Sequence, residues 1–177
     1  MNNTNLPTDY QTFIATSRYA RWIDDEGRRE TWGETVQRFM DNIVANVNID
    51  LKDKLDIHEA ILSLQVMPSM RALMTAGAAS ERDNTCVYNC SYLPVDHPRA
   101  FDEAMFILLC GTGVGFSVER QSIQKLPTVP EELQDVEDVI VVQDSKEGWA
   151  RGLRKLISLL YTGEIPKWNL TKIRPAG

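Results

Sequence analysis

The pattern of hydrophobic and polar positions is most informative between residues 84 and 120, a stretch that holds all three cysteines. Over residues 86–93, Cys and Tyr alternate with Val, Asn, Ser and Leu, which is typical of a strand, and Pro94 ends the pattern. Over residues 101–109, apolar positions recur at helical spacing. The stretch therefore predicts a strand followed by a helix.

Turn signals flank this predicted helix. We expect Asp96 to cap its N-terminus and Pro98 to lie in its first turn. After it, glycines at 111, 113 and 115 lead into residues 116–118, which predicts a glycine-rich turn that opens a short strand. A strand–helix–strand crossover joins parallel strands, and the carboxyl ends of such strands face the usual ligand crevice.

The first third of the chain predicts helices. Thr31 and Glu34 form a capping-box pattern before an apolar stripe over residues 36–47. A second helix is predicted through residues 58–64 and is expected to end at Pro68.

The later segments predict a mixture of elements. Residues 78–85 are expected to form a polar loop, and residues 139–142 a strand. An amphipathic helix is predicted over residues 144–160, with Gly163 as its stop signal. Residues 168–177 resemble the beginning of another strand.

Length and composition narrow the class of protein. The chain has 177 residues, 43% hydrophobic and 25% charged, enough for one sizeable core and a small lobe. A net charge of -6 argues against a nonspecific nucleic-acid binder. No apolar run is long enough to cross a bilayer and the polar start is not a secretory signal, so we expect a cytoplasmic protein with no membrane partner.

Arginines and aromatic residues are mixed over residues 18–32. Such a mixture can bind nucleotides, or it can anchor a lobe through aromatic packing while the arginines pair with acidic neighbours. We adopt the second interpretation, with Asp24, Asp25 and Glu30 as expected partners.

The three cysteines indicate buried thiols or redox chemistry rather than a disulfide scaffold. No metal site is predicted, because two histidines are the only other soft ligands. Each cysteine admits three roles: a buried small hydrophobe, a nucleophile with a base such as His97, or half of a redox pair. The buried role is favoured for Cys86 and Cys110. Cys90 differs because Asn89 and Ser91, which can hydrogen-bond to a ligand, flank it.

Six runs, taken in order, resemble the N-terminal part of adenosylcobalamin-dependent (class II) ribonucleoside-triphosphate reductases, and together they cover the chain from Tyr19 to Gly177. They are YARWIDDEGRRETWGETVQR, MPSMRALMTAG, YNCSYLPV, DEAMFILLCGTGVGFSVER, DSKEGW and KIRPAG. The resemblance implies an α/β fold: a helical N-terminal lobe, residues 1–66, followed in residues 67–177 by the first strands and helices of an incomplete ten-stranded barrel.

The resemblance also implies a chemistry. In that family, cobalamin homolysis generates a thiyl radical on a cysteine, the radical removes the 3′ hydrogen of the substrate, and the 2′ hydroxyl leaves as water. Two further cysteines supply electrons by closing a disulfide, which an external dithiol such as thioredoxin reopens. Cys90 matches one of these two cysteines. The matching substrate neighbourhood comprises Ser69, Asn89, Ser91 and Gly113, and Asp96 falls near the family's effector site.

The family's radical cysteine, its second redox cysteine and most of its cobalamin site come from later segments that this sequence does not contain. We therefore expect the chain to be inactive alone. Its expected partners are the missing C-terminal reductase segment, on a separate or spliced chain, a nucleotide substrate, a deoxynucleotide effector and a thioredoxin-like reductant. Adenosylcobalamin would be bound mainly by the missing segment.

Two alternatives stay open. One is a non-catalytic module that binds nucleotide or regulates an intact reductase. The other is a free-standing thiol oxidoreductase that uses Cys86 and Cys90. On one strand these residues would lie about 13 Å apart, whereas a disulfide needs Cα atoms within roughly 7 Å.

Overall fold

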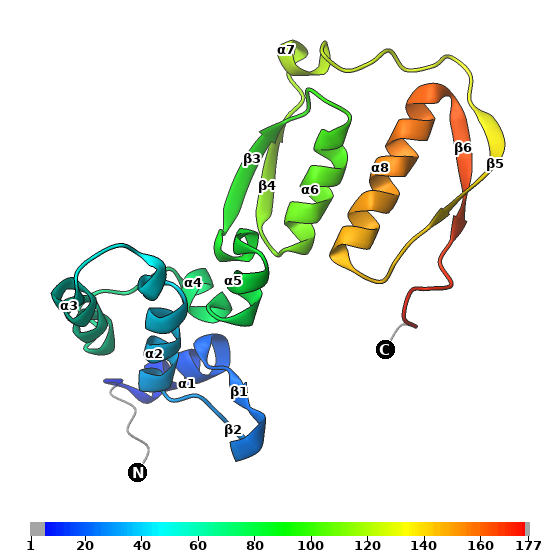
Figure 1. Cartoon of the computed structure of the whole chain (residues 1–177). Helices are drawn as coiled ribbons and strands as arrows, with labels where there is room; N and C mark the ends of the chain where they lie inside the picture. The colour runs from blue at the N-terminus through cyan, green and yellow to red at the C-terminus, as the bar shows by residue number, and fades with distance from the viewer. Residues whose placement is uncertain (1–5, 176–177) are drawn as a thin grey trace. The chain divides into compact units, whose positions relative to one another are not determined.

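The chain divides into two compact units, residues 1–88 and 89–177. The structure is a computed structural model that describes residues 6–175 (Figure 1). Each unit is described by itself below. The boundary predicted after residue 66 separates a helical lobe from the first part of a reductase barrel. This boundary stays a prediction.

The first unit is mainly helical. Its elements are α1 (Asp9–Ile14), the π-helical turn η1 (Ala15–Tyr19), β1 (Trp22–Ile23), the 3-10 turn η2 (Asp24–Glu26), β2 (Arg28–Arg29), α2 (Trp32–Asn42), the 3-10 turn η3 (Val44–Asn46), α3 (Leu51–Leu62), α4 (Met70–Thr75), α5 (Ala78–Arg82) and the 3-10 turn η4 (Asn84–Val87).

The predicted helix α2 is confirmed and forms the centre of this unit. The Thr31 side chain accepts from the backbone of Glu34, and the Glu34 carboxylate accepts from the backbone of Thr31, which completes the capping box. Val36, Phe39, Met40 and Val44 of the predicted stripe are buried, but the helix ends at Asn42 and Val47 is exposed. Trp32 donates its indole N–H to the carbonyl of Leu62 on α3 at 3.1 Å. The stripe packs against α3 and α4 through a cluster of Trp32, Val36, Phe39, Met40, Val44, Ile61, Ala72 and Leu73.

A buried ion pair joins the β1–β2 region to α2. Nε of Arg38 donates to Glu30 at 2.8 Å, and the two side chains are only 12% and 10% exposed. The other nitrogens of Arg38 donate to three backbone carbonyls, those of Leu73, Ala76 and Tyr19. The structural interpretation of the arginine-rich stretch is therefore supported, but with different partners. Arg28 contacts Glu26 and Glu34 instead of the expected aspartates.

Three predicted boundaries in this unit are wrong. Residues 78–82 form the short helix α5 instead of a loop, because the Ser80 hydroxyl satisfies the backbone of Gly77 at its start. Residues 86–87, expected to begin a strand, belong to the 3-10 turn over residues 84–87, because the Asp83 carboxylate accepts from the Thr85 amide at 3.0 Å and turns the backbone. Helix α3 ends at Leu62, before Pro68, because Leu64 adopts a φ of 64°.

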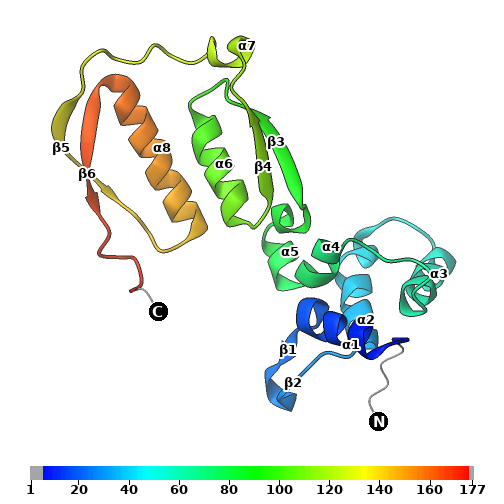
Figure 2. The same cartoon turned by 180° about the vertical axis from the view of Figure 1, so that it is seen from behind.

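The second unit consists of two consecutive strand–helix–strand units. Its elements are β3 (Cys90–Pro94), α6 (Arg99–Leu109), β4 (Gly113–Ser117), α7 (Arg120–Ile123), β5 (Gln134–Val141), α8 (Lys146–Thr162) and β6 (Glu164–Asn169). The pairs β3–β4 and β5–β6 are both parallel, as predicted for the first. Helices α6 and α8 pack together and lie between the two strand pairs (Figures 1 and 2).

Element ends in this unit differ from several predictions. The first strand begins at Cys90, and the glycines at 113 and 115 lie within β4 instead of preceding it. The N-cap of α6 is Pro98, because Asp96 pairs with Lys125 instead of the helix backbone. The final strand predicted over residues 168–177 is misplaced: β6 ends at Asn169, and residues 170–175 form no strand. β6 pairs with β5, which is longer than expected. Across residues 6–175 the strands form two-stranded sheets and no closed barrel.

Gly148, at the start of α8, gives a test of this packing. A methyl group there would overlap the carbonyl oxygen of Gln143. We expect Gly148→Ala to destabilise the second unit by about 1–3 kcal/mol, the usual cost of overpacking. Gly33→Ala in α2 is the matched control, because its methyl would meet only Leu62 at 4.0 Å. Urea denaturation compares the two variants, and equal stabilities would contradict the packing.

No helix within residues 6–175 is long and apolar enough to span a lipid bilayer.

Candidate functional site

Cys90 is the first residue of β3 and its side chain is exposed. The register places it opposite Gly113 of β4, and Tyr92 opposite Gly115. Because both partners on β4 are glycines, no side chain of that strand lies directly opposite Cys90 or Tyr92. The thiol is therefore open to a ligand on this face.

The neighbours of Cys90 are brought together by strand pairing. The amide of Gly113 donates to the carbonyl of Asn89 at 2.9 Å, and the Ser91 hydroxyl donates to the carbonyl of Gly113 at 3.1 Å. Alternate side chains of a strand point to opposite faces, and Ser91 is half-buried where Cys90 is exposed. Ser91 thus supports the β3–β4 pairing from the other face, while the Asn89 side chain is exposed next to Cys90.

The remaining predicted site residues lie elsewhere. Ser69 is the exposed N-cap residue of α4 in the first unit and makes no side-chain cap hydrogen bond. Cys86 lies in the turn η4 of the first unit and is half-buried. Since residues 86–90 are not one continuous strand, the distance estimate against a Cys86–Cys90 pair no longer applies. The structure holds all three cysteines as free thiols.

Asp96 lies just beyond the carboxyl end of β3, where a parallel crossover predicts a ligand crevice. Its carboxylate accepts from Lys125 at 3.2 Å, and the amide of Arg99 donates to Nδ1 of His97 at 3.2 Å. A cavity of about 370 Å³ opens here. It is lined by Leu93, Pro94, Asp96, His97, Arg99, Ala100 and Glu103.

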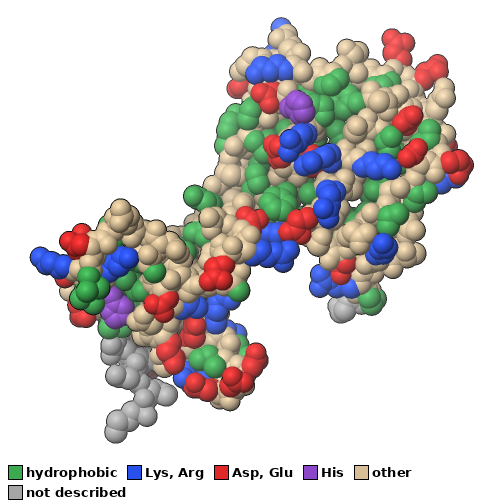
Figure 3. All heavy atoms as spheres, in the orientation of Figure 1, with side chains coloured by type: hydrophobic (Ala, Val, Ile, Leu, Met, Phe, Trp, Pro, Cys, Tyr) green, Lys and Arg blue, Asp and Glu red, His purple; other side chains and the backbone are tan. Residues whose placement is uncertain are grey.

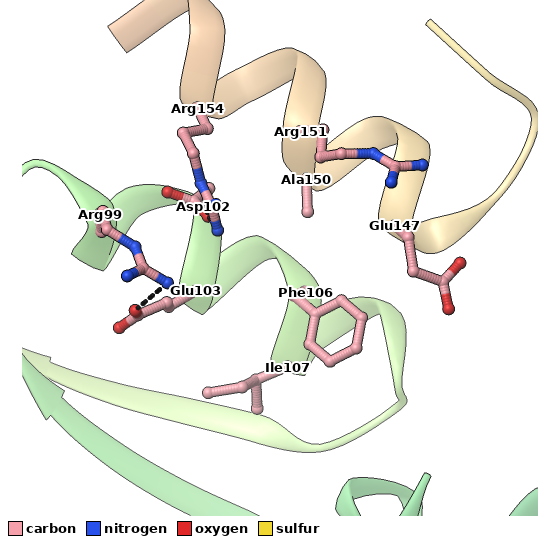
Figure 4. Close-up of a pocket in the computed structure, with 9 residues that line it drawn as sticks. All are labelled: Arg99, Asp102, Glu103, Phe106, Ile107, Glu147, Ala150, Arg151 and Arg154. Carbon is pink, nitrogen blue, oxygen red and sulfur yellow. Dashed lines mark hydrogen bonds and ion pairs between the residues drawn. The ribbon is translucent and has the colours of Figure 1, made fainter. Parts of the chain in front are cut away.

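A second cavity, of about 440 Å³, lies between α6 and α8 (Figure 4). On its wall Asp102 is 1% exposed, and one of its oxygens accepts from Nη2 and Nε of Arg154 at 2.6 and 2.9 Å. This hydrogen bonding raises the pKa of Arg154. Acidic and basic side chains gather over these two helices on the face that Figure 3 shows.

Sequence reasoning missed the contacts between α6 and α8. Asp102 and Arg154 are 52 positions apart, and Cys110, expected to be a buried apolar residue, is half-buried against Lys146 at 3.1 Å. Neither pairing leaves a local sequence signal, because each depends on the packing of two helices.

The residues present do not fit a resident corrinoid. The cavities described above are of about 370 and 440 Å³, at the small end for an organic ligand, and a corrinoid is larger than a drug-sized molecule. No step is therefore derived through adenosylcobalamin.

The fold has a solved counterpart. The chain superposes on a crystal structure of a B12-dependent (class II) ribonucleotide reductase with a TM-score of 0.76 at 22% identity, covering 92% of this chain and 32% of that one. The architecture of strand, helix and parallel strand around Cys90 is thus that of part of a class II ribonucleotide reductase.

Proteins of similar sequence have a more specific name than the solved structure. The chain is similar to adenosylcobalamin-dependent ribonucleoside-triphosphate reductases from Lactobacillus gasseri (24% identical) and Lacticaseibacillus paracasei (25%), over 90% of this chain and 31% of each relative. A reductase of the same name from Lactobacillus leichmannii is 25% identical over the same shares. The predicted resemblance is confirmed. The chain spans under a third of the length of these relatives, and no family model matches it.

Proposed function

We propose that this chain forms part of an adenosylcobalamin-dependent ribonucleoside-triphosphate reductase, in which Cys90 is one half of the redox disulfide. The observation that carries the proposal is the open thiol of Cys90 on a β3–β4 pair whose fold matches a class II reductase. In this role Cys90 and a second cysteine give two electrons and two protons to the ribose and close a disulfide. A thioredoxin-like dithiol then reopens it.

The second unit supports the idea that more reductase sequence completes the site. Both of its sheets have only two strands, so every strand leaves one edge with unpaired backbone groups. Large apolar side chains on the strands are exposed, including Tyr92 (68%), Phe116 (63%) and Trp168 (45%). Further strands of a ten-stranded barrel would pair with the free edges and cover these side chains. That sequence is carried by the same polypeptide or by another, and it would bind most of the cobalamin.

Around Cys90, the exposed Asn89 side chain and the open face at Gly113 are proposed to contact the nucleotide. The substrate-binding role expected of Ser69 stays a prediction. The cavity beside Asp96 is proposed to take the deoxynucleotide effector. Arg99 on the wall of this cavity pairs with Glu103, and Lys125 pairs with Asp96 at its edge; these two cations are proposed to meet the anionic nucleotide.

Deoxynucleotide formation tests the proposal. The isolated chain, given adenosylcobalamin, a ribonucleoside triphosphate and a dithiol, is expected to form no product. The protein purified from its native cells under gentle conditions, with everything joined to it or bound to it, is expected to form product only when adenosylcobalamin is added. Turnover by the isolated chain would refute the need for further sequence. No turnover by the native preparation would refute the reductase role and favour a regulatory module.

A further inference from the structure

The end of α6 and the start of α8 bring a thiol and an amine into direct contact, away from Cys90. Nζ of Lys146 donates to Sγ of Cys110 at 3.1 Å and lies 4.9 Å from the centroid of the Phe106 ring. Phe106 and Cys110 are one helical turn apart and lie on the same side of α6. Two side chains from one helix therefore hold the ammonium group against the sulfur atom.

The setting is suited to chemistry at sulfur. Cys110 and Lys146 are both half-buried, so a small molecule can reach them while neither is fully solvated. A neighbouring ammonium group favours the thiolate, which is the nucleophilic form of cysteine. By contrast, Lys155 and Lys167 place their ammonium groups against exposed carboxylates.

We propose that Cys110 and Lys146 form a reversible, peroxide-induced sulfenamide cross-link between the end of α6 and the start of α8. In the first step the thiolate attacks hydrogen peroxide: an S–O bond forms, the O–O bond breaks and hydroxide leaves. Sulfur is oxidised by two electrons and peroxide is reduced. The hydroxide takes a proton from the adjacent ammonium, which leaves water and a neutral amine beside the sulfenic acid.

In the second step the amine of Lys146 attacks the sulfur of the sulfenic acid. An S–N bond forms, the S–O bond breaks, and the hydroxyl group leaves as water with a proton from the nitrogen. The link covalently joins two helices that already pack together, so it requires no rearrangement of the unit. A dithiol reverses it: one thiol attacks sulfur and releases the amine, and the second closes a disulfide.

The test uses the full chain with Cys86→Ser and Cys90→Ser, in which Cys110 is the sole thiol. After treatment with hydrogen peroxide, intact mass under non-reducing conditions is expected to fall by two hydrogen atoms. Peptide mapping is expected to join the peptides that contain residues 110 and 146, and dithiothreitol to restore the starting mass. In the same background Lys146→Arg keeps a cation beside the sulfur and is expected to lower the cross-linked yield by about tenfold or more, while a sulfenic-acid trap still labels Cys110.

Peroxide products that only gain oxygen atoms would overturn the proposal, as would an equal loss of two hydrogen atoms in the Lys146→Arg variant. If that variant fails to fold, Phe106→Leu provides the second test, because it removes the ring that positions the ammonium. An undiminished cross-linked yield in Phe106→Leu, with the link mapped away from residue 146, would likewise overturn it.

Discussion

Replacing Cys90 by serine is expected to lower deoxynucleotide formation by the complete reductase by about three orders of magnitude or more, the scale seen when a reacting group is removed. Serine keeps the size and the strand position but cannot close a disulfide. Because Cys90 already lies open at the start of β3, the loss should come from chemistry and leave the fold intact. The measurement is product formed per enzyme with a dithiol in excess.

Cys86→Ser is the matched control for this prediction. Cys86 lies only four positions earlier, but in the turn η4, where the proposed function gives it no role. We expect this variant to retain the activity of the parent. A second readout is independent of turnover: after one round without reductant, peptide mapping should find Cys90, and not Cys86, in a new disulfide. Retained activity in Cys90→Ser would remove the redox role.

The parts of the fold that the sequence predicts correctly are those with local causes. The start of α2 follows from Thr31 and Glu34, which cap the helix within a single turn. The crossover β3–α6–β4 follows from a change of hydrophobic period between neighbouring segments. Both signals operate over a few residues, so tertiary packing does not need to be known.

The errors arise where polar side chains form hydrogen bonds within short turns, or pair with residues that are far away in the sequence. Alternating Cys and Tyr residues suggested a strand from residue 86, but the Asp83 carboxylate turns the backbone there. Asp96 has the chemistry of an N-cap, yet it pairs with Lys125, 29 positions away. Such pairs become visible only once the elements are placed in space.

The candidate site also has features that the sequence could predict and features that depend on the folded structure. Cys90 could be singled out from its flanking residues and from six ordered runs of resemblance, and the structure gives it an open face because glycines oppose it on β4. The placement of Cys90 and Ser91 on opposite faces of β3 follows from strand geometry and was not considered in the sequence. The contact of Lys146 with Cys110 depends on the packing of α6 against α8 and had no sequence signal.

The largest stability effect is expected at Arg38. Arg38→Met removes the cation that pairs with the buried carboxylate of Glu30, together with the donors to three backbone carbonyls. Breaking a buried pair by removing one partner costs about 3–5 kcal/mol. Because whole domains are stable by only about 5–15 kcal/mol, the first unit should lose a large share of its stability. Urea denaturation followed by tryptophan fluorescence measures the loss, in a background where Trp149 and Trp168 of the second unit are replaced by Phe.

Arg28→Met is the control, since Arg28 pairs with Glu26 and Glu34 at the surface, where an ion pair contributes little. A loss as large in this variant would show that charge removal in general, and not the buried pair, is responsible. Restoring much of the stability with Glu30→Gln in the Arg38→Met background would locate the cost at the unpaired carboxylate.

The pH dependence of stability distinguishes the contribution of the Arg38 charge from the contribution of its packing. Burial raises the pKa of Glu30, but hydrogen bonds from Arg38, the Arg21 backbone and Thr35 outweigh it and hold the pKa below its ordinary value of 4.5. In the parent, Glu30 therefore stabilises the fold above pH 4.5, and this contribution is lost as the pH falls through the lower folded pKa. Without Arg38, burial is left without its main opposing interaction, so the pKa of Glu30 should rise and protonation should relieve the variant. The stability gap between parent and Arg38→Met is thus expected to narrow on acidification, and a gap independent of pH would assign the loss to packing.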